Sequence, residues 1–477
     1  MATNVTTADA SAPAHLRRVL GTWDLTWLCV VAILNLNLVP VVAANGPATV
    51  WQWAAALLFF FLPQGIAVVE LSHRLPGEGG IYLWAKDQFG DFHGFVCGWC
   101  YWTTNMFFIP TLLFYMAGIL AYAGGKATAT LADNRVFFFL LTTALLWIIV
   151  ALNIRGMGVG KWINNLGGMG TLVAAIILIA LGLFSYFRFG SGFAPSAFAI
   201  KEMNWPLVSS FGVICFGLVG LELGSVMGDE IREPRRTVPR AVLWGGLLAG
   251  LFYVGSTLSL LLAVPQDKVV VVQGILQAVD AMTHRVNIAW LLPPLALLMA
   301  ASIIGATSAW MGGSARIMFV SGLDRYLPRV FGKIHPRYDT PHMALLGQAV
   351  LQTTIVSMSF IGASVKEAYQ TLLDVAVVLQ MVSYIYLYAA LLRVALRGGP
   401  KAFFSAPVIW FGSTSGLIAT VIGMIVAFVP SRTISSIWAF ESKLVGCSVL
   451  FLLLAAGLFW YYSRQKAKVT VYADTTH

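Results

Sequence analysis

The stretch Phe216-Gly217-Leu218-Val219-Gly220-Leu221-Glu222 places two glycines and a carboxylate inside an otherwise apolar segment, residues 206–228. Glycine weakens a helix, and a broken helix is tolerated in a bilayer only where the freed backbone is buried in protein or lines a cavity. An ionisable side chain at this depth is a functional residue by default, and burial disfavours its charged form. We therefore predict an interrupted helix in which Glu222 exchanges a proton. The alternative is a protonated carboxyl group that only hydrogen-bonds to a neighbouring helix.

A second interruption is predicted in the first apolar segment, residues 22–42. This segment contains Asn35-Leu36-Asn37 and then Pro40, which are poor residues for the middle of a membrane helix. The two interrupted segments occupy corresponding places if segments one to five and six to ten form two halves of the chain. Paired interruptions of this kind indicate a binding site at the interface of an inverted repeat.

The composition requires a membrane protein that is helical throughout. Of its 477 residues, 58% are hydrophobic and 10% are charged, against about 25% charged residues in soluble proteins. A membrane helix needs about 20 apolar residues, and twelve such segments are predicted. They are residues 22–42, 50–72, 94–122, 134–152, 165–187, 206–228, 241–264, 290–316, 343–361, 369–394, 406–429 and 440–462.

Lys and Arg are distributed unequally between the two faces that these spans define. The face that holds both termini carries 21 of the 30 Lys and Arg residues, which predicts that both termini are cytoplasmic in a cell (plasma or inner) membrane. The basic residues form no continuous stripe, so the net charge of +10 does not indicate nucleic-acid binding. The predicted organisation is a cytoplasmic tail (1–21), a ten-helix core (22–394, with repeats at about 22–187 and 206–394), two further helices (395–462) and a cytoplasmic tail (463–477).

Several stretches, in order, resemble the amino acid–polyamine–organocation superfamily. The segment Phe216–Arg240 is similar to the sixth helix and following loop of that family, with an aromatic residue, a small-residue break, Gly-x-Glu, acidic residues and an Arg/Pro-rich turn. Further similar stretches are Glu70–Trp84, Phe89–Phe95, Asn153–Gly156, Ser314–Pro328 and His335–Pro341. The chain most resembles bacterial glutamate/γ-aminobutyrate exchangers, chiefly between Val264 and Gln348.

The resemblance implies a leucine-transporter-type fold: a 5+5 inverted repeat, broken helices 1 and 6, and two peripheral C-terminal helices. It implies a secondary active transporter of amino acids that works by alternating access, as an exchanger or coupled to protons. A polyamine or organic-cation carrier is the alternative, which would need more carboxylates facing the cavity, and a sodium-coupled amino-acid symporter is another. The expected partners are a small-molecule substrate and the lipid bilayer, and the oligomeric state stays open.

The resemblance also implies roles for individual residues. The family's Gly-Ser-Gly-like break, whose amides hold the substrate carboxylate, matches Asn35, Leu36 and Asn37, a departure that leaves substrate choice open. A helix N-terminus can still bind an anion there; the alternative is that the two Asn side-chain amides only satisfy broken backbone. The remaining matches are the gating aromatic Phe216, the unwound Gly217 and Gly220, and the covering aromatics Tyr101 and Trp310.

Other polar residues are secondary candidates. Asn105 lies one turn beyond Tyr101 and should share its face, while Tyr384, Gln380 and Asp374 lie in the tenth span. Cation coupling is less defined: span 5 has no lysine, and Thr171, Thr307 and Ser308 are as consistent with helix packing as with a cation site. Histidine spacing predicts no metal site, and neither a catalytic arrangement nor a cofactor motif is evident, so an enzyme is not expected.

Overall fold

The structure is a computed structural model in which the described residues form helices and connecting turns. It describes residues 19–123, 128–131, 133–190, 205–264, 268–272, 274–324, 326–361, 364–397, 402–429 and 437–474. Within these ranges the only β-type contacts are two isolated bridges, Leu20 with Ile231 and Glu78 with Met227. The predicted N-terminal tail therefore lies almost wholly outside the described residues.

The helices are named in chain order. They are α1 (Thr22–Ile33), α2 (Leu38–Ala43), α3 (Thr49–Ala56), the π-helical η1 (Leu57–Phe61), α4 (Leu62–Arg74), α5 (Ile81–Phe89), α6 (Asp91–Ala123), η3 (Ala129–Leu131), α7 (Arg135–Ile154), α8 (Met157–Phe189), α9 (Trp205–Gly217), α10 (Leu223–Val226), η5 (Gly228–Glu230), α11 (Pro234–Ala263), α12 (Gly274–Arg285), η7 (Ala289–Leu291), α13 (Leu292–Leu323), η8 (Arg329–Gly332), α14 (His342–Ser359), α15 (Val365–Arg397), α16 (Ala406–Val426) and α17 (Ile437–Asp474).

Nine helices in the described ranges are long and apolar enough to cross a membrane, counting α3, η1 and α4 as one. The predicted spans 22–42 and 206–228 are absent from these nine because each is divided, into α1 and α2 and into α9 and α10. The predicted span 343–361 corresponds to α14, which is 18 residues long. The described helices therefore agree with the multi-pass helical membrane protein that the composition predicts.

Several predicted boundaries were wrong because helices continue past their apolar parts. Helix α8 begins at Met157 rather than 165, and its polar residue Asn165 donates a 2.8 Å hydrogen bond to Asp24 of α1. Helix α11 begins at Pro234, since proline is favourable in a first turn. Helix α17 continues to Asp474, into the stretch predicted as a tail. The short helices α5 and α12 lie between the predicted spans, where no helix was predicted.

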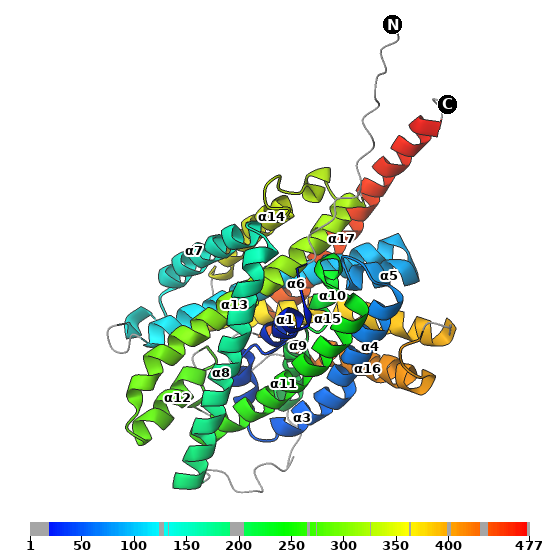
Figure 1. The fold of residues 1–477 in the computed structure, drawn as a ribbon. Helices are drawn as coiled ribbons and strands as arrows, with labels where there is room; N and C mark the ends of the chain where they lie inside the picture. Colours follow the sequence, from blue (N-terminus) through cyan, green and yellow to red (C-terminus); the bar gives the residue numbers. More distant parts are fainter. Residues whose placement is uncertain are drawn as a thin grey trace.

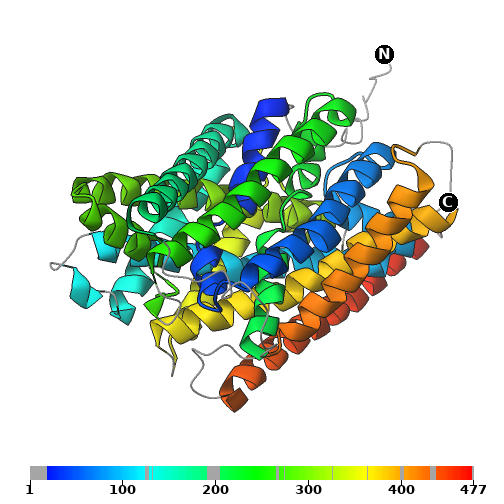
Figure 2. The same ribbon diagram turned by 90° about the horizontal axis from the view of Figure 1, so that it is seen from below.

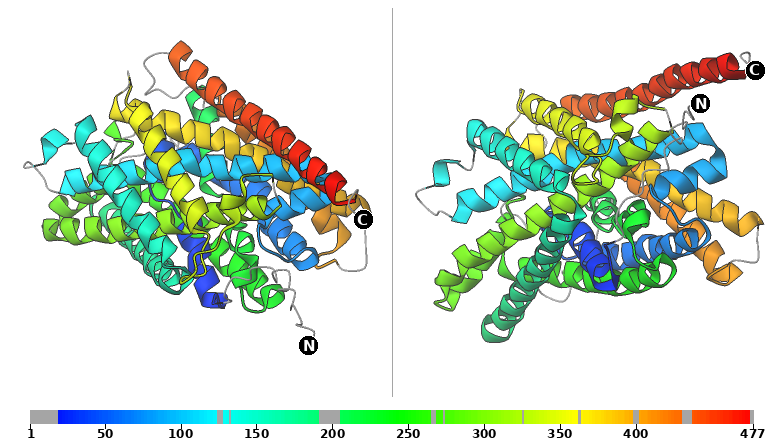
Figure 3. Two further views of the ribbon diagram at one scale, coloured as in Figure 1. Left: turned by 90° about the horizontal axis from the view of Figure 1, so that it is seen from above. Right: turned by 45° about the horizontal axis from the view of Figure 1, so that its top comes forward.

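The interrupted helices lie in the middle of the bundle and the last helix lies outside it. Figure 1 shows α1, α9 and α10 surrounded by α6, α11, α13 and α15, with α17 leaving the bundle at the upper right of the view. In Figure 3 α17 runs across the outer face. The most apolar window of α6 is 83% buried and that of α17 is 22% buried, which separates a central helix from a peripheral one.

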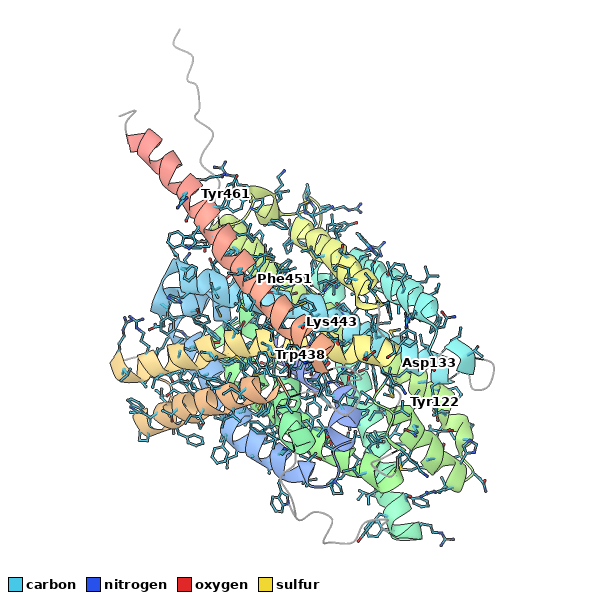
Figure 4. All side chains as sticks on the ribbon, turned by 180° about the vertical axis from the view of Figure 1, so that it is seen from behind. Tyr122, Asp133, Trp438, Lys443, Phe451 and Tyr461 are labelled. Atoms are coloured by element: carbon cyan, nitrogen blue, oxygen red, sulfur yellow. The ribbon has the colours of Figure 1, made fainter. Side chains whose placement is uncertain are left out.

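Helix α17 is attached to the bundle through α6. The Trp99 indole donates a 2.9 Å hydrogen bond to the Phe451 carbonyl, and the Phe107 ring packs edge-on against the Phe451 ring. Figure 4 shows Trp438, Phe451 and Tyr461 spaced along this outer helix. Trp438 is 82% exposed, as expected of an aromatic side chain that faces lipid or its interface.

Candidate functional site

The two helix interruptions face each other. Helix α1 ends at Ile33 and α2 begins at Leu38, while α9 ends at Gly217 and α10 begins at Leu223. Gly220 has φ +133°, a backbone conformation that other residues rarely adopt, and a Cβ atom there would lie 3.0 Å from the Ile33 side chain. Glycine at this position is therefore required both for the backbone turn and for the close approach of the two interruptions.

Tyr253 of α11 joins the two interruptions. Its fully buried hydroxyl lies within hydrogen-bonding distance of the Ile33 carbonyl (2.6 Å) and the Gly217 carbonyl (3.0 Å), to which it can donate. It also accepts a hydrogen bond from the backbone N–H of Asn35 (2.9 Å). Sequence reasoning did not select Tyr253, because its helix is otherwise read as an ordinary apolar span. The tyrosine hydroxyl within an apolar span could have indicated a role for Tyr253, since a buried tyrosine hydroxyl usually has a hydrogen-bond partner.

Replacing Tyr253 with phenylalanine is expected to lower the free energy of unfolding by about 1–3 kcal/mol, because the buried backbone N–H of Asn35 loses its acceptor. Thermal unfolding in detergent measures this change. Tyr122→Phe is the matched control, since the partly buried Tyr122 hydroxyl, near the end of α6, donates its hydrogen bond to Asp280 of α12 and not to either interruption. Equal effects of the two substitutions would show that the Tyr253 hydroxyl does not contribute more to stability by joining the two interruptions than an ordinary tyrosine hydroxyl does.

Glu222 is the centre of a second hydrogen-bond cluster. Its carboxylate is fully buried and accepts hydrogen bonds from the Tyr101 hydroxyl of α6 (3.0 Å), the Gln64 amide of α4 (2.9 Å) and the Tyr384 hydroxyl of α15 (2.5 Å). The Gly220 backbone amide donates to it as well (3.0 Å). The carboxylate thus connects the second interruption to three other helices. Of the residues predicted from sequence, the structure brings Glu222, Tyr101, Tyr384 and Gly220 together, and it adds Gln64.

A continuous series of aromatic rings adjoins this cluster. Phe216 packs edge-on against Phe108 with ring centroids 4.9 Å apart, Phe108 packs against Trp310 (5.9 Å), and Trp310 lies beside Tyr101 (6.1 Å). The Trp310 indole also donates a 3.0 Å hydrogen bond to the Ala32 carbonyl at the end of α1. Three aromatic residues predicted separately are therefore linked, through Phe108, into one layer over the interruptions.

The residues Asn35, Leu36 and Asn37 line a small cavity together with Tyr115 and Ser302. Its volume of about 10 Å³ corresponds to about one water molecule. The side-chain amide nitrogen of Asn35 donates hydrogen bonds to the Ala32 and Ile33 carbonyls, so it satisfies backbone groups that the interruption leaves unpaired. The Asn35 side-chain oxygen and the Tyr115 hydroxyl have no hydrogen-bond partner among the described residues. Two buried polar atoms thus remain available at the cavity.

The Asn37 side chain reaches a different helix. Its amide donates a 3.2 Å hydrogen bond to the Tyr369 hydroxyl of α15, and that hydroxyl lies 3.3 Å from the Asn37 carbonyl. The start of α2 is therefore held to α15 at a point separate from the Glu222 cluster. Gly217 completes the contact between the interruptions, because a Cβ atom there would lie 3.1 Å from the Leu38 side chain.

Some predicted residues are not brought to the interruptions by any contact in the described structure. The Asn105 side chain donates back to the Tyr101 carbonyl, and Asp374 accepts from Gln370 on its own helix. Gln380 is fully buried, and both of its polar atoms lack a partner among the described residues. Thr171 contacts Ser302. Within the described ranges no cluster of three His, Cys, Asp or Glu residues is placed to hold a metal ion.

A third polar cluster closes the bundle on the side where the described chain begins. Arg316 of α13 makes a two-point ion pair with Glu230 of η5 (2.8 and 2.9 Å) and lies 3.5 Å from the Glu78 carboxylate. The Glu230 carbonyl accepts from the Leu20 amide, and Glu78 accepts from the Asp229 amide (3.0 Å). Sequence reasoning read these residues only as charges and motif positions. Their proximity ties the loop after α4 to both α13 and the segment after α10.

The contacts that hold Glu78, Glu230 and Arg316 together are expected to become less stable as pH rises. Burial raises the pKa of Glu78 to about 8, against the opposing effect of Arg316, while Glu230 and Asp229 also favour the protonated form through their charges. A raised pKa means that the buried state binds the proton more tightly than an exposed carboxyl group does. The stabilisation is thus complete below about pH 4.5 and is lost as pH rises through about 8. Hydrogen exchange of the 77–81 and 226–231 backbone, measured from pH 6 to 9, tests this.

Glu78→Gln is the control for the pH measurement, because glutamine cannot ionise but keeps the shape of the side chain. After correction for intrinsic exchange, wild-type protection should fall with rising pH and protection in the variant should not. The same pH dependence in both proteins would assign the titration to another group.

Comparison with known proteins places this arrangement in a family. The family model for amino acid permeases matches residues 20–440. The chain is 29% identical to an uncharacterised transporter of Legionella pneumophila over 464 residues, which cover 94% of this chain and 98% of that protein. It is 23% identical to a probable agmatine/putrescine antiporter of Lactococcus lactis (77% of each chain) and 24% identical to an uncharacterised transporter of Mycobacterium bovis (70% of this chain, 72% of that protein).

The matched range contains both interruptions, the Glu222 cluster and the aromatic layer. The family and these relatives indicate a transporter and not an enzyme. The chain belongs to the amino acid permease family of transporters, within the amino acid–polyamine–organocation superfamily.

Proposed function

We propose that this protein is a secondary active transporter that carries amino acids by alternating access, as an exchanger or with proton coupling. The observation that carries the proposal is the Glu222 carboxylate, which is fully buried at the second interruption and bonded by side chains from α4, α6 and α15. A carboxylate held in this way can change partners, and its proton, when the helices move. Burial disfavours its charged form, which favours a proton in at least one step of the cycle.

The substrate would bind between the two interruptions. Its carboxylate would lie at Asn35–Asn37, where the Tyr115 hydroxyl, which has no partner among the described residues, is placed to donate a hydrogen bond to it. Its amino group would meet carbonyl groups freed between Gly217 and Gly220. Because the cavity holds about one water, Phe216 and the rest of the aromatic layer must move before a substrate enters.

The finer architecture is part of the same proposal. Counting α1 with α2 and α9 with α10 as interrupted spans, and adding α14, gives twelve spans. We assign spans one to ten to a 5+5 inverted repeat, with α16 and α17 as peripheral helices. The excess of Lys and Arg on one face favours a cell membrane location with both termini in the cytoplasm.

A thermal-stability screen of the purified protein in detergent tests the substrate class. The ligands are the twenty amino acids, γ-aminobutyrate and common polyamines, at two pH values and with sodium or potassium. A ligand at about 100 times its dissociation constant should stabilise the folded protein by about 2.7 kcal/mol. We expect stabilisation by one class of amino acid without a requirement for sodium. Stabilisation by polyamines alone would contradict the proposal.

A polyamine or organic-cation carrier is the second candidate, favoured by one observation: the similarity to the agmatine/putrescine antiporter. A dication needs carboxylates that face the cavity. Glu222 already accepts hydrogen bonds from three side chains, and Asp374 is bonded by Gln370 on its own helix. The contacts therefore favour a substrate with its own carboxylate. A sodium-coupled symporter would use Thr171, Thr307 and Ser308. The Thr171 hydroxyl, however, already contacts Ser302 and the Gly167 carbonyl, and the Ser308 hydroxyl accepts a hydrogen bond from Asn153.

A further inference from the structure

A long apolar groove opens on the lipid-facing side of the bundle, away from the aromatic layer. Its volume of about 1120 Å³ is slightly above the roughly 300–1,000 Å³ of typical small-molecule sites. Figure 2 shows α4, α11 and α16 side by side along this face. The lining includes Leu62 and Ile66 of α4, Leu243 and Leu247 of α11, and Pro407 and Phe411 of α16.

The depth of the groove is set by glycines at its floor. A Cβ atom on Gly246 would lie 3.4 Å from the Phe61 ring, and one on Gly250 would lie 3.0 Å from the Leu57 side chain. Leu57 and Phe61 belong to the π-helical turn η1, which presents them to α11. The floor also includes Gly65 and Leu221, the sequence neighbours of Gln64 and Glu222. The groove therefore lies directly behind the Glu222 cluster.

One wall of the groove is fixed by a buried carboxylate. Glu70 of α4 is fully buried and accepts hydrogen bonds from the Phe403 and Phe404 amides (3.0 Å each), and it forms an ion pair with Arg74 (2.6 Å). Phe403 and Phe404 line the groove. These bonds hold the segment before α16 against α4, so the groove is a built feature and does not depend on a loose loop.

Two arginines lie on α11 just beyond one end of the groove lining. Arg236, Arg240, Leu243 and Leu247 follow each other at intervals of three or four residues, so they share one face of α11. Arg240 is exposed, and Arg236 is 79% exposed with Glu233 at 3.6 Å. Leu243 and Leu247 are 56% and 58% exposed. This end lies on the side where the described chain begins, because Arg232 bonds to Leu20 just before α11.

The dimensions match one leaflet of a membrane. From Pro239 to Leu251 the groove follows thirteen residues of α11. Their twelve steps of 1.5 Å rise about 18 Å, and one leaflet contributes about 15 Å of hydrocarbon. Apolar walls over this length with arginines at one end suit an acyl chain below an anionic headgroup. We propose that a phospholipid with an anionic headgroup binds in the groove between α4, α11 and α16, its phosphate at Arg236 and Arg240.

Native mass spectrometry of the full-length protein in detergent tests this proposal. The probes are dioleoyl phosphatidylglycerol, dioleoyl phosphatidylcholine and dioleoylglycerol, each at the same concentration. We expect phosphatidylglycerol to be retained several-fold more than phosphatidylcholine, and dioleoylglycerol least. The double substitution Arg236→Gln/Arg240→Gln should lower phosphatidylglycerol retention to the phosphatidylcholine level, and Leu247→Trp, which fills the groove from its rim, should lower retention of all three.

Matched controls lie on other surfaces. Arg329→Gln changes an exposed arginine of η8, and Leu453→Trp changes a 65% exposed leucine of α17, and neither residue lines the groove. Both controls should retain lipid as the wild type does. Equal retention of the two phospholipids, or an Arg236→Gln/Arg240→Gln variant that keeps the preference, would overturn the proposal. A dimer that dissociates on Leu247→Trp would do so too, because it would assign the groove to a second copy of the chain.

Discussion

Replacing Glu222 with alanine is expected to lower the rate of amino-acid exchange in proteoliposomes at least about 100-fold, equivalent to about 2.7 kcal/mol. The substitution leaves the buried donors of Tyr101, Tyr384 and Gln64 without their shared acceptor. Each unsatisfied buried group costs about 1–3 kcal/mol, so the geometry between the second interruption and its neighbours is lost. The measurement is uptake of labelled substrate by counterflow, normalised to reconstituted protein.

Glu222→Gln separates geometry from proton exchange. Glutamine keeps one oxygen acceptor but cannot ionise, so exchange should persist at a reduced rate while its pH dependence disappears. Asp374→Asn is the matched control, because Asp374 is also a buried carboxylate but accepts from Gln370 on its own helix. Normal, pH-sensitive exchange in Glu222→Ala would remove Glu222 from the mechanism. Loss of pH dependence in Asp374→Asn alone would move the proton site to α15.

Replacing Arg316 with alanine is expected to lower the free energy of unfolding by about 3–5 kcal/mol, because it leaves a buried charge without its partner. Glu230 then loses a two-point ion pair and Glu78 loses its nearest positive charge. All three side chains are at most 8% exposed, so water cannot replace the lost partner without opening the structure. Thermal and denaturant unfolding in detergent, followed by circular dichroism, measures the change.

Arg337→Ala provides the comparison for Arg316, because Arg337 is exposed and packs only over the neighbouring Tyr338 ring among the contacts described. Surface substitutions of this kind usually change stability by less than about 0.5 kcal/mol. A double substitution, Arg316→Met with Glu230→Leu, should recover much of the loss, since apolar residues can replace a buried ion pair. If Arg316→Ala were as stable as Arg337→Ala, the cluster would not hold the closed bundle together.

The interruptions were predictable from sequence because their signals are local. Asn35, Asn37, Gly217 and Gly220 are poor helix residues set in apolar surroundings, and both helices end at the predicted places. Glu222 was predictable for a similar reason, as a carboxylate where few polar residues occur. What these residues bond to was not predictable. Gln64 and Tyr384 lie 158 and 162 positions from Glu222 along the chain, and no spacing rule connects them.

Tyr253 and the Arg316 cluster were missed for a related reason. A tyrosine within an apolar span is compatible with simple packing, and only the assembled fold reveals that it bridges residues 218 and 36 positions away. Helices α5 and α12 were missed because they are short and carry polar residues, which removes the long apolar run used to recognise a span. Local composition thus specified where helices break, and tertiary contacts decided which side chains meet there.

We propose above that the chain binds and transports an amino acid at a site between its two interrupted helices. Counterflow tests it most directly: proteoliposomes are loaded with one unlabelled amino acid or polyamine at a time, and uptake of the same labelled compound is recorded. We expect uptake with one class of amino acid, absent in Glu222→Ala and independent of sodium. Uptake of putrescine or agmatine but of no amino acid would contradict it, and the site between Asn35–Asn37 and Gly217–Gly220 would then have to be assigned to a cation.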